Sequence, residues 1–298
     1  MCGIVGLFLK DKALEPQLGA LLSDMLITMT DRGPDSAGIA IYGPSEAGSG
    51  KITVQSADPV ADFKGLKAAL AKKLGVAVSM TIRATHAVIA VECGKLDAAR
   101  TALKELRPGI TVMGSGESVE IYKEVGLPKD VAARFKIGAM GGTHGIGHTR
   151  MATESAVTTF GAHPFSTGPD QCLVHNGSLS NHNNLRRELV RNGLRFETEN
   201  DTEVAAAYLS HKLATGSNLG AALESGLSDL DGFYTFVVGT KSGFGVLRDP
   251  IACKPAVMAE TDGYVAFGSE YRALVNLPGI EAARVWEPEP ATVYFWEH

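Results

Sequence analysis

The 298-residue sequence contains few cysteines, and none of them is paired locally. Its four cysteines, Cys2, Cys93, Cys172 and Cys253, lie far apart and form no CxxC pair. Structural zinc sites and the disulfide frameworks of small secreted proteins both use closely spaced cysteines. The spacing therefore argues against both and predicts a protein of a reducing compartment.

Long apolar runs and clusters of basic residues are also missing from the sequence. No apolar stretch is long enough to cross a bilayer, and the N-terminus lacks the basic and apolar regions of a signal peptide. The net charge is -5, whereas a nucleic-acid-binding surface needs a clustered basic face. We therefore expect a cytoplasmic protein that binds neither membrane nor nucleic acid.

The composition that remains is typical of a globular protein, with 45% hydrophobic and 20% charged residues. A chain of this length can form one large domain or two small ones. An apolar strand at 2–9 precedes leucines and methionines at helical spacing from Leu14 to Met29. Glycine, serine and proline at 43–50 predict a loop, and residues from about 58 to 136 predict an inserted α/β segment that includes a helix around 96–106.

The second half of the chain is predicted to alternate strands and helices. A strand at 171–177 leads through a turn into one helix, and a second helix starts near 201, with Asp201 or Thr202 at its N-cap. Strands then occupy most of 232–298. Strands at both ends of the chain with helices between them predict an α+β fold of two packed sheets flanked by helices.

Cys2 raises the question of a nucleophile at the very start of the chain. By itself it is most simply interpreted as a small buried residue beside Gly3. If Met1 is removed, however, the freed α-amine of Cys2 titrates near pH ~8 and lies within reach of its own thiol, so it can act as the base. If Met1 is retained, that nitrogen belongs to a peptide bond and cannot act as a base.

Three other positions could complete such a site. Asn176 and Gly177, at the end of an apolar strand, could supply a side-chain amide and a backbone N–H for an oxyanion hole, although Asn-Gly is also a common hairpin turn. Arg150 has the geometry to hold a carboxylate, and could equally be a surface arginine. Asp201 could bind an ammonium group or cap a helix.

The motifs "MCGIVG", "RGPDSAG", "GHTRMAT", "AHPF", "HNGSLSNHNNLRREL" and "NDTEV" together resemble those of the class II glutamine amidotransferases. The resemblance covers residues 1–50 and about 139–298. It implies an N-terminal nucleophile hydrolase fold, an αββα sandwich, with residues 1–298 forming one glutamine amidotransferase type 2 domain that contains the segment at about 58–136.

The resemblance also implies roles for individual residues. Cys2 would be the nucleophile, and Asn176 with Gly177 would form the oxyanion hole. Arg150 would bind the α-carboxylate of glutamine and Asp201 its α-ammonium group. Thr153 and His163 are the remaining substrate-binding predictions, and His148 and His175 are expected to have supporting roles. The expected products are glutamate and ammonia.

A glutaminase of this kind normally passes ammonia to a synthase, and the sequence shows no phosphate loop, metal cluster or dinucleotide fingerprint for one. The chain most resembles the glutaminase-type subunit of N-methylglutamate synthase or of a split glutamate synthase. That likeness implies that this chain holds no cofactor. It also implies that partner subunits hold FMN, FAD or NAD(P) and iron–sulfur clusters. The inserted segment is expected to dock those partners.

Two other interpretations stay open at this level. The chain could be a regulatory subunit that binds glutamine or glutamate without turnover, which retention of Met1 would favour. It could also be another N-terminal nucleophile amidase, although provision for both ends of an amino acid at Arg150 and Asp201 argues against that.

Overall fold

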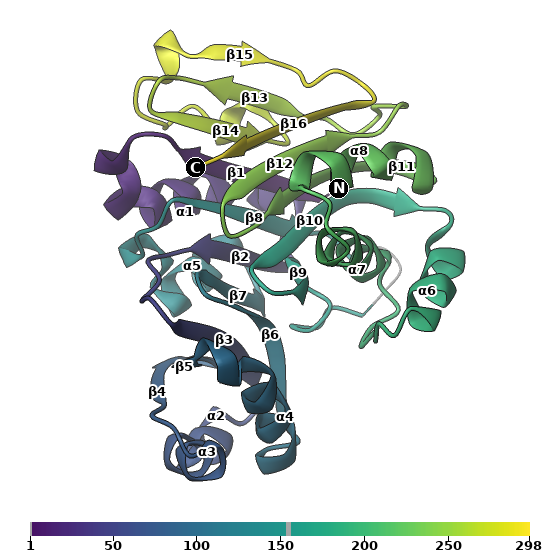
Figure 1. Ribbon diagram of the computed structural model, residues 1–298. Coiled ribbons are helices and arrows are strands. Elements are labelled where there is room, and N and C mark those ends of the chain that lie inside the picture. The colour runs from purple at the N-terminus through teal and green to yellow at the C-terminus, as the bar shows by residue number, and fades with distance from the viewer. Residues whose placement is uncertain (1, 153–155) are drawn as a thin grey trace.

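The computed structural model describes residues 2–152 and 156–298, and within them the strands form three antiparallel sheets (Figure 1). The first sheet has the order β15 (Arg284–Trp286), β13 (Val257–Glu260), β14 (Tyr264–Gly268), β1 (Gly3–Leu9), β8 (His144–Arg150), β2 (Ser36–Tyr42) and β7 (Val119–Val125). The second has the order β16 (Thr292–Glu297), β12 (Gly243–Arg248), β11 (Gly232–Gly239), β10 (Gln171–Leu179) and β9 (Phe165–Gly168). The inserted sheet has the order β4 (Ser79–Arg83), β5 (His86–Glu92), β3 (Ser49–Ser56) and β6 (Ile110–Gly116).

The first and second sheets pack face to face, and β1 shows why. All seven of its residues are buried. Because successive side chains of a strand point to opposite faces, Ile4 and Phe8 enter the core between the sheets, while Leu7 faces the helices on the other side. At Gly6 a Cβ would lie 2.6 Å from the ring of Phe244 on β12, so the sheets approach closely at that point.

Helices cover the two outer faces of this pair of sheets. The first sheet is covered by α1 (Leu18–Thr28) and α5 (Pro128–Phe135). The second is covered by α6 (His182–Arg191), α7 (Asp201–Ala214) and α8 (Leu219–Asp229), as Figure 1 shows. The order helix, sheet, sheet, helix confirms the predicted α+β fold and its αββα sandwich.

The first predicted helix differs at its start. Residues Lys12–Gln17 form the 3-10 helix η1, and the α-helix begins only at Leu18. Pro16 lies inside η1, where its missing N–H cannot continue an α-helical hydrogen-bond ladder. The other 3-10 segments are η2 (Thr30–Arg32), η3 (Cys93–Lys95), η4 (Ile137–Ala139), η5 (Tyr271–Ala273) and η6 (Ile280–Ala282).

The inserted sheet forms a separate layer with its own helices, α2 (Pro59–Phe63), α3 (Leu66–Leu74) and α4 (Leu96–Leu106), and its own apolar core. We call residues 49–116 the inserted layer. It starts earlier and ends earlier than the segment at about 58–136, because β3 already pairs with β5 and β6, whereas β7 pairs with β2 and α5 packs on α1. The predicted loop at 43–50 accordingly ends where β3 begins at Ser49.

Helix lengths in the described ranges also bear on the membrane question. No helix within residues 2–152 and 156–298 is both long and apolar enough to span a bilayer.

Candidate active site

Cys2 and Arg150 lie side by side at one end of the first sheet. Cys2 directly precedes β1 and Arg150 is the last residue of β8, and these antiparallel strands pair Gly3 with Thr149. The half-buried Cys2 has its Sγ 4.0 Å from the carbonyl oxygen of Met151. The strand register thus brings together two residues that are far apart in the sequence.

Asn176 reaches the same point from the second sheet. Its side-chain Nδ2 donates a hydrogen bond to the backbone oxygen of Cys2 at 3.3 Å, and the residue is buried. The hairpin-turn interpretation of Asn-Gly is wrong, because β10 continues through the pair to Leu179 and Asn176 faces Thr235 of β11. Asn176 is therefore a mid-strand residue whose amide is directed at the start of the chain.

Gly177 adopts a backbone conformation that favours glycine. Its φ is +146°, and a Cβ built at this position would lie 1.9 Å from the carbonyl oxygen of Phe233. A side chain would therefore separate β10 from β11 next to Asn176. Glycine allows the two strands to pair closely here.

Arg32 is a site residue to which the sequence analysis assigned no role. Its Nε donates to the backbone oxygen of Cys2 at 3.0 Å, and its Nη1 donates to Glu270 at 2.6 Å. Two buried side chains, Arg32 and Asn176, thus hold the same carbonyl group and orient Cys2. Arg32 begins the "RGPDSAG" motif, and Glu270 lies 238 residues further along the chain, so only the fold shows that they meet.

Arg150 is buried, which excludes the surface-arginine interpretation. Its Nη1 donates to the carbonyl oxygen of Ala156 at 3.3 Å. The chain that follows it is held by Asp35, whose Oδ2 accepts from the Ala152 N–H at 2.8 Å. The guanidinium is therefore held by the segment that follows β8, while the backbone of Arg150 lies beside Cys2. Thr153, predicted to bind substrate, lies outside the described residues.

Asp201 is the first residue of α7, and it is not the N-cap. Asn200 occupies that position, and its side chain accepts from the Thr202 N–H at 2.8 Å. The Asp201 Oδ2 instead accepts from the Leu179 N–H at the end of β10 at 3.0 Å. Burial alone would raise the pKa of this carboxyl, but the neighbouring His175 ring and the Leu179 N–H outweigh it and lower the pKa to about 2. Asp201 is ionised at neutral pH.

Three buried histidines form a cluster beside the start of α7. His163 Nε2 and His175 Nδ1 lie 2.8 and 3.1 Å from the hydroxyl oxygen of Thr202, and His148 Nε2 bonds the carbonyl oxygen of His175. Burial lowers the pKa of His148 to about 3 and that of His163 well below its usual range. Both are poor proton acceptors at neutral pH. The contacts of His163 are those of a scaffold residue, and direct contact with substrate stays a prediction.

Comparison with known proteins places this geometry in a family. Residues 148–276 match the family model described as "Glutamine amidotransferase domain". The glutamine amidotransferase-like protein GlxB of Rhizobium meliloti (strain 1021) is 72% identical over 298 residues, which cover 100% of this chain and 99% of that protein. The chain belongs to the glutamine amidotransferase family.

Other relatives of this amidotransferase agree. A protein of Methanothermobacter thermautotrophicus, whose name is also that of a glutamine amidotransferase, is 36% identical over 313 residues and matches over the full length of both chains. The solved structure of glutamine phosphoribosylpyrophosphate amidotransferase from B. subtilis has a TM-score of 0.63 at 19% identity. This likeness shows a shared N-terminal nucleophile hydrolase fold. The alignment covers 99% of this chain and 47% of that protein, about half of its length.

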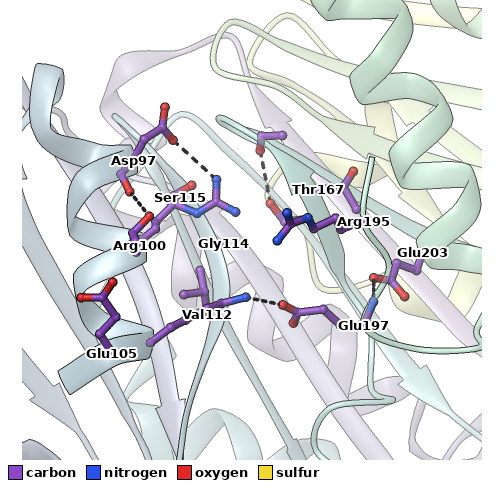
Figure 2. Close-up of a pocket in the computed structure, with 14 residues that line it drawn as sticks. Asp97, Arg100, Glu105, Val112, Gly114, Ser115, Thr167, Arg195, Glu197 and Glu203 are labelled. Atoms are coloured by element: carbon purple, nitrogen blue, oxygen red, sulfur yellow. Dashed lines mark hydrogen bonds and ion pairs between the residues drawn. The ribbon is translucent and has the colours of Figure 1, made fainter. Parts of the chain in front are cut away.

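A cavity beside the inserted layer of this amidotransferase lies away from Cys2. It has a volume of about 490 Å³ and opens between α4 of the inserted layer, β9 and the segment leading into α7 (Figure 2). Its lining residues are charged on both sides, and an ion pair of 2.7 Å joins Lys104 to Glu197. The candidate active site is therefore located by the side chains that converge at the ends of β1, β8 and β10, and this cavity is not part of it. Among the described residues, no group of three or more His, Cys, Asp or Glu side chains could hold a metal ion.

Proposed function

We propose that this class II amidotransferase is a glutaminase in which Cys2, freed of Met1, is the nucleophile. The observation that carries the proposal is the convergence on Cys2: Asn176 and Arg32 hold its carbonyl group, and Arg150 lies beside it on the neighbouring strand. Two of the buried histidines nearby, His148 and His163, are weak bases. A free α-amine on Cys2 is then the group best suited to accept the thiol proton.

The reaction follows from these positions. The Cys2 amine takes the thiol proton, and the thiolate sulfur forms a bond to the carboxamide carbon of glutamine. The oxyanion is stabilised by the side-chain amide of Asn176 and the N–H of Gly177. The C–N bond breaks as the amine returns its proton to the leaving ammonia. Water then attacks the thioester, with the same amine as base, and releases glutamate and the thiol.

Substrate orientation is assigned to two charged residues. Arg150 would hold the α-carboxylate through its planar guanidinium, and the ionised Asp201 would hold the α-ammonium group. Because these contacts form in the ground state as well as the transition state, they should act mainly on KM. Thr153 and His163 are kept as secondary substrate-binding proposals.

The test combines the N-terminal mass with glutamine turnover. We expect the purified protein to begin at Cys2 and to release ammonia from glutamine, and Cys2→Ala to abolish that release. Cys93→Ala is the matched control, since Cys93 lies in η3 of the inserted layer. A Cys2→Ala protein as active as the wild type would overturn the proposal. Retained Met1 with glutamine binding but no turnover would instead establish the regulatory subunit.

A second measurement separates glutaminase from other amidases. Arg150→Lys should raise KM for glutamine about 100-fold, because a single ammonium cannot replace the bidentate guanidinium. Its KM for an amide without an α-carboxylate should change little. If such an amide is the better substrate of the wild type, the enzyme is an acylase and not a glutaminase.

We also propose that the chain is a subunit of a glutamate-synthase-like complex, most closely an N-methylglutamate synthase that converts methylamine and glutamate into N-methylglutamate and ammonia. Its partners would carry FMN, FAD or NAD(P) and iron–sulfur clusters. A true glutamate synthase is the alternative. The proposed docking surface is a shallow hollow of about 320 Å³ on the inserted layer, lined by Val60, 82% exposed, and Ile82, 56% exposed.

Co-purification tests this assignment. The tagged chain should retain a partner with flavin absorbance, and the complex should consume methylamine in the presence of glutamate. Val60→Glu with Ile82→Glu should release the partner, whereas Val190→Glu, at an exposed apolar residue of α6, should not. Ammonia incorporation into 2-oxoglutarate without methylamine turnover would indicate a true glutamate synthase.

A further inference from the structure

Two neighbouring residues on β7 contact the segment 156–164, which follows the candidate substrate-binding Arg150. β7 is the edge strand of the first sheet, and Lys123 and Glu124 are its buried charged residues. Adjacent side chains of a strand point to opposite faces, so the pair holds the segment from both sides of this edge.

The side chain of Lys123 binds the backbone of the segment. Its Nζ donates to the carbonyl oxygens of Phe160, Ala162 and Pro164 at 3.1, 2.8 and 3.2 Å. Three backbone carbonyl oxygens of the segment thus surround one side-chain nitrogen. Nζ also lies 4.5 Å from the centre of the Phe165 ring. The buried amine of Lys123 thus fixes the backbone path of the segment 156–164.

Glu124 joins the segment to the inserted layer. One carboxylate oxygen, Oε1, accepts from the hydroxyl of Thr159, and the other, Oε2, accepts from the hydroxyl of Thr85 at 2.9 Å. Thr85 belongs to the turn between β4 and β5 and directly follows Ala84, which lines the apolar surface formed with Val60 and Ile82. A single carboxylate therefore connects that surface to the segment 156–164.

The segment in turn touches Arg150 at two points. The Arg150 Nη1 donates to the carbonyl oxygen of Ala156, and a Cβ built on Gly161 would lie 3.4 Å from the same nitrogen. A displacement of the segment would therefore change the surroundings of the guanidinium. Lys123 and Glu124 have no role in the bond-making steps described above.

We propose that Lys123 and Glu124 are positioning residues that hold segment 156–164 against Arg150, and that Glu124 extends this hold to the inserted layer through Thr85. The proposal rests on the proposed glutaminase function for its kinetic consequence: a loosened segment weakens the binding of the glutamine α-carboxylate. The inserted layer then supports substrate affinity as well as offering a surface to a partner.

The experiment compares matched substitutions on the same strand. Lys123→Met and Glu124→Gln should each raise KM for glutamine about tenfold with kcat changed less than about twofold. Hydrogen exchange of the peptide covering 156–164 should accelerate in both variants. The controls are Lys51→Met and Glu120→Gln, which break an ion pair between β3 and β7 of 2.9 Å that does not involve the segment. Both controls should leave KM and segment exchange unchanged.

Thr159→Val provides the same test without altering a buried charge, since it removes only the hydroxyl that the segment donates to Glu124. Thr85→Val should raise KM about threefold in the same direction, and an unchanged KM in that variant would overturn the link to the inserted layer. Unchanged KM and exchange in folded Lys123→Met and Thr159→Val would overturn the positioning role. If the wild type hydrolyses no glutamine, the proposed function fails, while the exchange measurement still tests whether β7 holds the segment.

Discussion

The side-chain Nδ2 of Asn176 lies 3.3 Å from the backbone oxygen of Cys2, although the two residues are 174 positions apart. This hydrogen bond joins the second sheet to Cys2, the residue directly before β1. A carboxamide nitrogen has two hydrogens, so Asn176 can hold the Cys2 carbonyl with one and present the other to a reacting group. The same residue can therefore both position the nucleophile and stabilise an oxyanion.

Asn176→Ala should lower kcat for glutamine hydrolysis about 100- to 1000-fold, because it removes one of the two proposed oxyanion donors. KM should change much less, since the donor acts mainly in the transition state. Steady-state kinetics check this, with Asn192→Ala, at an exposed residue beyond α6, as the control. A loss confined to KM would instead place Asn176 among the groups that bind the ground state.

Gly177→Ala should destabilise the fold by about 4 kcal/mol, since the added methyl group would meet the Phe233 carbonyl at 1.9 Å in a backbone conformation that already favours glycine. Gly193→Ala is the matched control: its φ is +89°, and nothing lies within 4 Å of the added carbon. It should cost only about 1 kcal/mol. Chemical denaturation of the two variants separates steric clash from backbone strain, and equal losses would contradict the clash.

Asp201 should make the free energy of unfolding depend on pH in the acidic range. Because the folded state lowers the pKa of this carboxyl from 3.8 to about 2, its stabilising contribution is complete above about pH 4 and is lost as the pH falls toward 2. The loss should be about 2 kcal/mol. Asp201→Asn should lack this part of the pH dependence, whereas Asp24→Asn, at an exposed residue of α1, should retain it. Parallel denaturation curves for wild type and Asp201→Asn would contradict the prediction.

Lys123 should make the free energy of unfolding depend on pH in the alkaline range. Burial lowers the pKa of its amine from 10.5 to about 7, against the opposing charges of Glu203 and Glu197. Between these values the unfolded chain binds the proton and the folded chain does not, so stability should rise with pH by about 1.4 kcal/mol per unit. The difference in unfolding free energy between wild type and Lys123→Met, measured from pH 7 to 10, should have this slope. A flat difference would show that the amine keeps its proton throughout.

Several local elements could be predicted from the sequence because their signals are local. The helix expected around 96–106 forms α4 over Leu96–Leu106, and the apolar strand expected at 2–9 forms β1 over Gly3–Leu9. Other elements carried a weaker signal. In β3, only Ile52 and Val54 alternate with polar residues. In β7, Lys123 and Glu124 interrupt the alternation of a half-buried strand, and their burial depends on neighbouring strands and segments.

The candidate site divides in the same way. The sequence by itself determined the chemistry available: a cysteine next to the N-terminus, an Asn-Gly pair, and the arginine and aspartate of motifs that resemble those of one family. Only the tertiary structure decided which groups meet. Strand register set Cys2 beside Arg150, pairing of β10 with β11 excluded a hairpin at Asn176, and Asn200 took the helix cap and left Asp201 available. The first two are contacts between residues distant in the chain, and their free energies depend on burial and alignment that no local pattern contains.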